Sequence, residues 1–167
     1  PWPISVATSL GLQLCRELQA AHDEGVIHRD LKPQNVFLVG LANDPEVRVL
    51  DFGLSRIVEL AETAVTQTGI VMGTPQFMAP EQARGERADH RIDIYGVGAV
   101  LYSAITGKPP FDEESPQQTI LAVMSREPPR PCSIISSIPP ELEVIVQKAM
   151  ARMPDDRFAT MRELEAA

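Results

Sequence analysis

The residues whose types could do chemistry gather in two short stretches of the chain. The first stretch holds Asp30, Lys32 and Asn35, and the second begins with Asp51. A carboxylate in such a set can act as a base, and an ammonium group can offset negative charge. Carboxylate and amide oxygens are also the hard ligands that Mg²⁺ prefers. These residues can act together only if the fold brings the two stretches side by side.

Two brief apolar runs, at 36–39 and 47–50, separate the two stretches and predict a β-hairpin around the turn-rich segment 40–46. If the runs pair antiparallel, Asn35 faces Asp51, with Cα atoms roughly 4.5–5.5 Å apart. An amide oxygen and a carboxylate then meet at one end of the hairpin, where they suit Mg²⁺. Either residue alone is better explained as a turn or cap residue. The combination with Asp30 and Lys32 favours a metal site.

Helical patterns surround this hairpin. Apolar residues at three- and four-residue steps predict an amphipathic helix that ends near Gly25, and the run 92–105 is apolar nearly all round, as in a buried helix. Ser115 and Thr160 have the sequence context of helix N-caps, and apolar spacing at 142–149 predicts another helix. The Pro- and Ser-rich segment 128–140 predicts a connector. The expected fold class is mainly α with one small β-hairpin.

Composition bounds the class of protein. With 167 residues, 44% hydrophobic and 23% charged, the chain fits one soluble globular domain. A formal charge of −8 argues against a nucleic-acid partner, which usually selects a basic face. Two cysteines allow no disulfide framework or metal cluster, so we expect a reducing compartment, the cytoplasm. No run of 18 apolar residues occurs, so we expect no membrane segment in this chain, although the parent protein could carry one elsewhere.

The two chemical stretches resemble known motifs. His-Arg-Asp-Leu-Lys-Pro-Gln-Asn at 28–35 resembles the catalytic loop of protein kinases, and Asp51-Phe52-Gly53 resembles their magnesium loop. Ala79-Pro80-Glu81 is similar to the motif that closes their activation segment. Lys32 within Leu-Lys-Pro indicates the serine/threonine branch, and the stretches 65–68 and 73–85 resemble bacterial members. The resemblance covers essentially the whole chain. It implies a partial kinase domain over 1–167, namely the helical carboxy-terminal lobe without the amino-terminal lobe.

The resemblance implies roles around ATP and a metal ion. Asp30 would accept or orient the proton of the substrate hydroxyl, and Lys32 would offset the charge of the γ-phosphate. Asn35 and Asp51 would hold Mg²⁺, or Mn²⁺, between the phosphates. Phe37 matches the position that forms the floor under adenine, although a buried strand aromatic explains it equally well.

Further roles fall on the segment after Asp51. Gly53 would let the chain turn sharply after the metal ligand. Thr74 matches the residue that contacts both the catalytic Asp and Lys. Arg29 would bind a phosphate on the activation segment through its fork of N–H groups. Thr66 and Thr68 are the candidate phosphorylation sites. An equally good interpretation of either residue is an ordinary solvated threonine in a loop.

Three residues resemble architectural positions of the family. Glu81 and Arg157 match an internal ion pair that ties the activation segment to the lobe. Asp93 matches a buried carboxylate that binds the backbone of the catalytic loop. His28 is interpreted as a packed core residue rather than a base, and the sequence indicates no partner for His22 or His90.

The expected function is transfer of the ATP γ-phosphate to Ser or Thr hydroxyls of protein substrates by the parent protein, with self-phosphorylation and dimerisation as further expectations. The Gly-rich loop, the strand Lys and the helix Glu of the kinase signature cannot be located here, so the 167 residues alone are expected to be inactive. A pseudokinase or interaction module with the same fold is the main alternative. A small-molecule phosphotransferase and a purely structural helical protein are the others.

Overall fold

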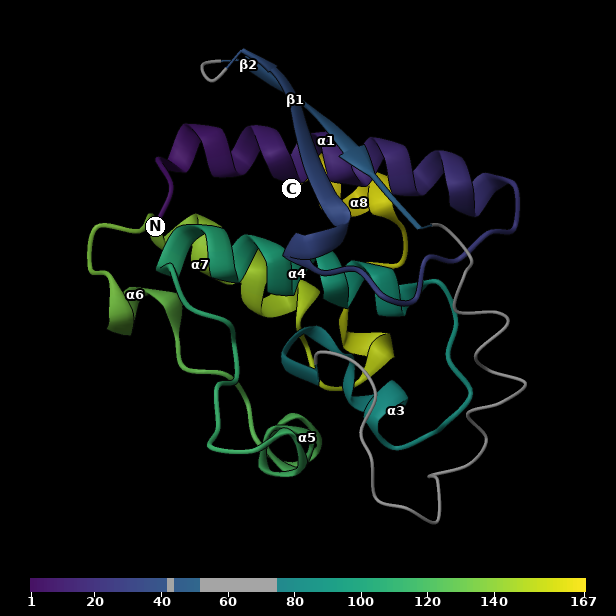
Figure 1. The fold of residues 1–167 in the computed structure, drawn as a ribbon, viewed down its shortest axis with the longest axis vertical. Coiled ribbons are helices and arrows are strands. Elements are labelled where there is room, and N and C mark those ends of the chain that lie inside the picture. Colours follow the sequence, from purple (N-terminus) through teal and green to yellow (C-terminus); the bar gives the residue numbers. More distant parts are fainter. Residues whose placement is uncertain (42–43, 52–74) are drawn as a thin grey trace.

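The computed structural model describes residues 1–41, 44–51 and 75–167. They form a helical body with one two-stranded antiparallel sheet lying across its surface (Figure 1). The strands are β1 (Val36–Leu41) and β2 (Asp44–Val49). The helices are α1 (Ile4–Asp23), α3 (Pro80–Ala83), α4 (Arg91–Thr106), α5 (Pro116–Ser125), α6 (Pro131–Ile134), α7 (Pro140–Ala149) and α8 (Met161–Ala166), with 3₁₀ turns at Pro33–Asn35, Pro75–Phe77 and Pro154–Asp156. The expected fold class, mainly α with a small hairpin, is confirmed.

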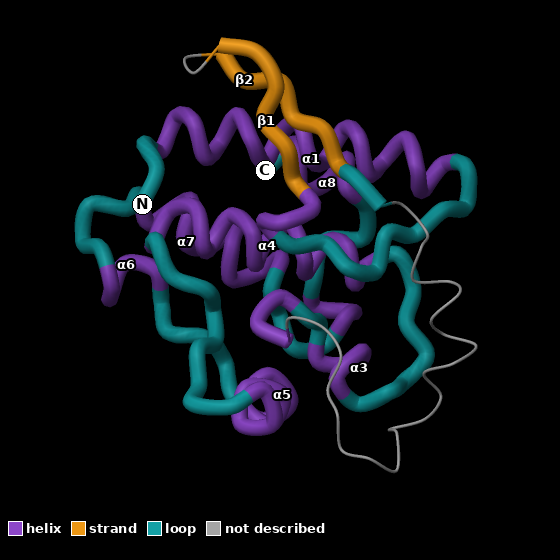
Figure 2. The backbone as a smooth tube through the Cα atoms, in the orientation of Figure 1, coloured by secondary structure: helices purple, strands orange, loops and turns teal. Residues whose placement is uncertain are grey.

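Helix α4 is the centre of the body, because its sequence is apolar on nearly every side. Helices α1 and α7 pack against it, and α8 packs against α1 (Figure 2). Two glycines allow neighbours to come close to the α4 backbone. A Cβ on Gly96 would lie 2.9 Å from the Leu31 Cβ, and one on Gly98 would lie 2.7 Å from the Met150 Cγ. The segment around Leu31 therefore rests directly on the core helix.

Helix α1 forms as its pattern predicts. Leu10, Leu14 and Leu18 lie one turn apart and are buried, so one stripe of the helix faces α4 and α8. The helix ends at Asp23, two residues before the expected Gly25, and Gly25 itself adopts a φ of 74° that favours glycine. The chain then turns back toward the hairpin.

The predicted helix starts are largely correct. Ser115 caps α5, with its hydroxyl accepting from the Gln118 N–H at 3.2 Å. Thr160 caps α8 in the same way through Glu163 N–H. In a capping box, the residue three positions after the cap accepts from the N–H of the cap residue itself. The Glu163 carboxylate instead accepts from the Ala159 N–H, one residue before Thr160. The expected connector 128–140 contains one short helix, α6, because Pro131 starts a helical turn after Arg130.

The hairpin is longer than predicted. Both strands continue into the segment that was expected to be a turn, and the register pairs Val36 with Val49 and Leu41 with Asp44. With that register Asn35 lies opposite Leu50, as the 2.9 Å bond from the Leu50 N–H to the Asn35 carbonyl shows. The expected pairing of Asn35 with Asp51 is wrong by one residue, since the second run ends one position before the assumed strand end.

Candidate active site

The loop before β1 brings three of the predicted residues into contact. The Lys32 Nζ lies 2.6 Å from the Asp30 Oδ2. The Asn35 side-chain nitrogen donates to the Asp30 carbonyl at 2.8 Å and lies 3.4 Å from the same Oδ2. Asn35 is buried at the end of the Pro33–Asn35 turn, whereas half of the Asp30 side chain (52%) is exposed. The loop thus presents a carboxylate to solvent with an ammonium group and an amide beside it.

Asp93, on the first turn of α4, holds the backbone of this loop. Its Oδ2 accepts from the His28 N–H and its Oδ1 from the Arg29 N–H, both at 2.8 Å. Arg29 has a φ of 70°, in the left-handed region that non-glycine residues adopt only when their surroundings hold them there. The carboxylate is 1% exposed, so its charge is stabilised by these N–H groups. Asp93 therefore fixes the backbone conformation one residue before Asp30.

His28 connects the loop to the end of the hairpin. Its Nε2 donates to the Leu50 carbonyl at 2.9 Å, since a carbonyl only accepts. Its Nδ1 then serves as the acceptor for the Asp30 N–H at 3.3 Å. The ring is 1% exposed, so His28 is a packed linking residue in this structure. The peptides next to Asp30 and Asp51 are both bonded to one imidazole.

Asp51 directly follows this anchored peptide and is exposed. It has a φ of 63°, so the extended chain of β2 stops there. Asp51 and Arg29 are the two non-glycine residues with positive φ in the described chain. Asp51 follows Leu50, whose carbonyl is bonded by His28, and the N–H of Arg29 is bonded by Asp93. Such backbone conformations commonly occur at functional sites.

The donor set fits Mg²⁺ in part. The nitrogen of the Asn35 amide is used inside the loop, which leaves its oxygen as the end that can meet a cation. Asp51 adds a carboxylate. Within residues 1–41, 44–51 and 75–167, no group of three His, Cys, Asp or Glu side chains forms a complete metal cluster. One or two protein ligands completed by phosphate oxygens and water is the usual arrangement for Mg²⁺.

Phe37 lies on β1 and is 50% exposed. Its neighbour on the same face of the strand, Val39, is 52% exposed. Leu50 adds further exposed apolar surface at the other strand. The interpretation of Phe37 as a buried strand aromatic is therefore wrong. The hairpin offers an uncovered apolar face beside the loop that holds Asp30.

Gln82 is a residue that the sequence reasoning missed. Its side-chain nitrogen donates to the Arg29 carbonyl at 2.7 Å, and its oxygen accepts from Ala79 N–H at 3.1 Å. Together with Asp93 it holds the backbone of Arg29 at both its N–H and its carbonyl. A Gln at the third position of a helix started by Pro80 signals a local cap, and nothing in the sequence pattern reveals its second bond, 53 residues away.

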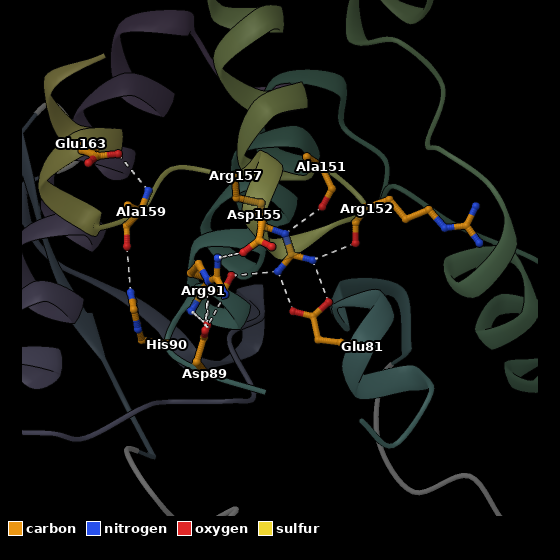
Figure 3. Close-up of polar contacts among 10 residues, drawn as sticks. All are labelled: Glu81, Asp89, His90, Arg91, Ala151, Arg152, Asp155, Arg157, Ala159 and Glu163. Carbon is orange, nitrogen blue, oxygen red and sulfur yellow. Dashed lines mark hydrogen bonds and ion pairs between the residues drawn. The ribbon is translucent and has the colours of Figure 1, made fainter. Parts of the chain in front are cut away.

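Glu81, on α3, and Arg157 form an ion pair, drawn in Figure 3. Arg157 also donates to the carbonyls of Ala151, Arg91 and Arg152, so its guanidinium bonds three segments of the chain, at 81, 91 and 151–152. It lies over the ring of Tyr95, 5.0 Å from the ring centroid, and burial raises the pKa of the Tyr95 phenol. This cluster anchors α3, and hence Gln82, to the body.

The two histidines without expected partners both have one. The His22 Nε2 lies 2.8 Å from the Asp93 Oδ2, so it donates to a carboxylate that already accepts two N–H groups. The His22 Nδ1 is buried, and among the described residues it has no hydrogen-bond partner. His90 donates to the Ala159 carbonyl at 2.8 Å (Figure 3). His22 therefore adds a third donor to the residue that holds the loop.

Four predicted site residues, Gly53, Thr66, Thr68 and Thr74, lie outside the described residues. The other predicted residues converge on two places. At the end of the hairpin lie Asp30, Lys32, Asn35 and Asp51. The second place is the ion pair of Arg157 with Glu81 on α3. Arg29 and Asp93 connect the two places.

The helical body, the hairpin and the loops at its end are those of the protein-kinase fold. A model of the family "Protein kinase domain" matches residues 3–166, and the chain belongs to that family. Its similarity to curated relatives places it among serine/threonine kinases of bacterial type.

Three relatives show this similarity. The chain is 42% identical over 168 residues to the probable serine/threonine-protein kinase PknB of Corynebacterium glutamicum. The matched region covers 98% of this chain and 25% of the relative. It is 41% identical to the serine/threonine-protein kinase Pkn1 of Myxococcus xanthus, over 96% of this chain and 23% of the relative. It is 39% identical to PknB of Mycobacterium tuberculosis, over 91% and 24%. The chain thus spans about a quarter of the length of these relatives.

Among its described residues, no helix has the length and apolarity to cross a membrane.

Proposed function

We propose that the protein containing this chain transfers the γ-phosphate of ATP to Ser or Thr hydroxyls of protein substrates. The observation that carries the proposal is the contact of Asp30 with Lys32 and Asn35, on a loop that His28 bonds to the peptide before Asp51. Phosphoryl transfer relies on positioning and charge stabilisation, and this arrangement supplies both.

The side chains divide the work of the reaction. The half-exposed Asp30 carboxylate accepts the proton of the substrate hydroxyl as that oxygen bonds to the γ-phosphorus, while the bond from this phosphorus to the bridging oxygen breaks and ADP leaves. Lys32 offsets negative charge on the transferring phosphoryl group and restrains the Asp30 carboxylate. Asn35 and Asp51 hold Mg²⁺ or Mn²⁺, which neutralises phosphate charge when it is bound. Phe37 contributes its exposed face to the adenine.

The remaining family positions belong to the same proposal. Gly53 provides the turn after the metal ligand, and Thr74 contacts Asp30 and Lys32. Arg29 receives a phosphate placed on Thr66 or Thr68, since its guanidinium bonds phosphate bidentately. Self-phosphorylation and dimerisation belong to the same proposal.

We further propose that residues 1–167 form the carboxy-terminal lobe of the kinase domain. The sequence contains no G-x-G-x-x-G segment, the loop that covers the phosphates in protein kinases. Without that cover, water raises the dielectric around Asp30 and Lys32 and weakens their charge stabilisation. The 167 residues alone are therefore inactive, and the activity belongs to the longer protein.

The test measures phosphate transfer from labelled ATP to a Ser/Thr-containing protein by the full-length protein with Mg²⁺. We expect transfer by the wild type and a loss of roughly 10²–10⁴-fold in the D30N variant, the usual contribution of a general base. D156N, which changes an exposed Asp on the Pro154–Asp156 turn, is the matched control and should retain activity. A folded wild type that binds ATP and Mg²⁺ without transferring phosphate would instead identify a pseudokinase.

A further inference from the structure

The outer edge of β2 is bound by side chains of α1. β2 pairs with β1 along one edge only, so alternate N–H groups on its other edge point away from the sheet. The Val47 N–H donates to the Gln13 Oε1, and the Val49 N–H donates to the Glu17 Oε2, both at 2.9 Å. Helix α1 thereby takes the place of a third strand.

The spacing of the two elements explains why this works. Residues four apart on a helix are separated by about 6 Å along its axis, and residues two apart on a strand by about 6.6–6.8 Å. Gln13 and Glu17 are four apart and Val47 and Val49 are two apart, so both bonds form in one register. The side chains of Val47 and Val49 are buried as well, which keeps the strand close to the helix.

The second bond acts close to the metal site. Val49 is two residues before Asp51, and the intervening Leu50 is held at its N–H by the Asn35 carbonyl and at its carbonyl by His28. Glu17 adds the anchor on the opposite edge, through a carboxylate, which forms stronger hydrogen bonds than a neutral group. Its other oxygen accepts from Arg48 at 3.2 Å. The peptide chain is thus fixed at three consecutive hydrogen-bonding points before it turns at Asp51.

We propose that Glu17, supported by Gln13, is a positioning residue for the metal-binding carboxylate of Asp51. The proposal rests on the proposed function, because it assigns a metal ion to Asp51. Glu17 lies on α1 and contacts the strand rather than the substrate, the nucleotide or the metal, so it acts only through β2. Its loss allows the end of β2 to move away from α1 and lowers the fraction of molecules with Asp51 correctly placed.

The test compares E17A, E17Q and R48Q in the full-length protein. The dissociation constant of Mn²⁺ is measured by electron paramagnetic resonance with a non-hydrolysable ATP analogue present. We expect E17A to raise this constant about fivefold, the factor that corresponds to the net loss of one hydrogen bond. E17Q keeps an acceptor for Val49 N–H and should stay within about twofold of wild type. R48Q removes the other contact of Glu17 and should leave Mn²⁺ affinity unchanged.

Amide hydrogen exchange of Val47, Val49 and Leu50 provides the second measurement. Faster exchange at these amides in E17A, together with weaker Mn²⁺ binding, supports the proposal. Faster exchange with unchanged Mn²⁺ affinity would show that Glu17 only stabilises β2. Unchanged exchange would show that the bond from the Val49 N–H to Glu17 does not hold β2. Either result overturns the proposal. If E17A does not fold, Q13L, which removes the Val47 bond together with the contact of Gln13 with Ser9, is compared with E17Q. Identical Mn²⁺ affinity and exchange in both variants and in the wild type would overturn the proposal. A wild type that binds no Mn²⁺ with the analogue refutes the proposed function itself, while exchange still decides whether Glu17 anchors β2.

Discussion

Glu81 and Arg157 are bound to each other by two parallel hydrogen bonds, of 2.6 and 2.7 Å, across 76 residues of sequence. Both side chains are almost completely buried, at 4% and 0% exposure. A buried charge without its partner is strongly unfavourable, so the two residues depend on each other. The pair fixes α3 against the turn that precedes α8.

We predict that E81A lowers the thermal midpoint by roughly 10 °C, since removal of one partner of a buried pair costs about 3–5 kcal/mol. The E81L/R157M double variant should not restore the midpoint, because the carbonyls of Ala151, Arg91 and Arg152 would then lose their donor. Differential scanning calorimetry of the chain measures both.

The matched control for this prediction is E165A. The Arg16–Glu165 pair is a surface contact, with 66% and 28% of its side chains exposed. Such pairs contribute about 0–1 kcal/mol, so the midpoint should change by less than about 4 °C. Equal losses in E81A and E165A would contradict the role given to burial.

Asp93 should be needed for both activity and stability. In D93N, one of the two carboxylate oxygens becomes an NH₂ group, which is a donor. It then faces another donor: the Arg29 N–H if it replaces Oδ1, or the His28 N–H and the His22 Nε2–H if it replaces Oδ2. We expect kcat to fall at least about tenfold, since the Arg29 peptide loses the bond that holds its left-handed conformation. Steady-state assays of the full-length protein measure this. D89N, in a surface pair with Arg91, is the control and should keep wild-type kcat.

The sequence was sufficient for the elements and for the local cluster at the hairpin. Helical spacing identified α1, α4 and α7, and the loop motif identified Asp30, Lys32 and Asn35, because these features depend on residues close together in the chain. The strand ends and the register were wrong, since β1 and β2 continue through Gly40 and Pro45, which usually indicate a turn.

The missed residues share a physical reason. Gln82, Gln13, Glu17 and His22 all act through one bond to a distant backbone or carboxylate group. Polar residues on a helix face usually contact water, so nothing in their spacing distinguishes them from solvated side chains. Tertiary packing decides which of them meets a distant backbone or carboxylate group.

Cys15 should be inert in the folded protein. It lies on α1 at 2% exposure, and burial, with a smaller effect of the nearby Glu165 charge, raises the pKa of its thiol to about 12. Because the thiolate is the reactive form, we expect C132S to show no rapid reaction with Ellman's reagent at pH 8. One thiol should react after denaturation in guanidinium chloride. A rapid stoichiometric reaction of native C132S would contradict this burial.

Glu143 predicts a specific pH dependence of stability. Hydrogen bonds from the Cys132 N–H, the Cys132 side chain and Arg130 hold the pKa of this carboxyl below its ordinary value of 4.5. A lowered pKa contributes stability that is complete above the unfolded-state value and is lost as the pH falls through the folded-state value. We therefore expect E143Q to be less stable than wild type at pH 7, with a difference that shrinks as the pH falls below about 4.5. Urea unfolding at pH 7 and pH 3.5 measures this, and a difference that grows in acid would refute it.

Arg29 has its N–H on Asp93 of α4 and its carbonyl on Gln82 of α3. These two bonds hold the peptide planes on either side of Arg29, so neither plane can rotate without breaking the bond that anchors it. The main chain at Asp30 is therefore carried rigidly by the two helices, and its carboxylate can adjust chiefly by torsion about its own side-chain bonds. Any signal that repositions α3 would reach the Asp30 carboxylate as a displacement of the main chain.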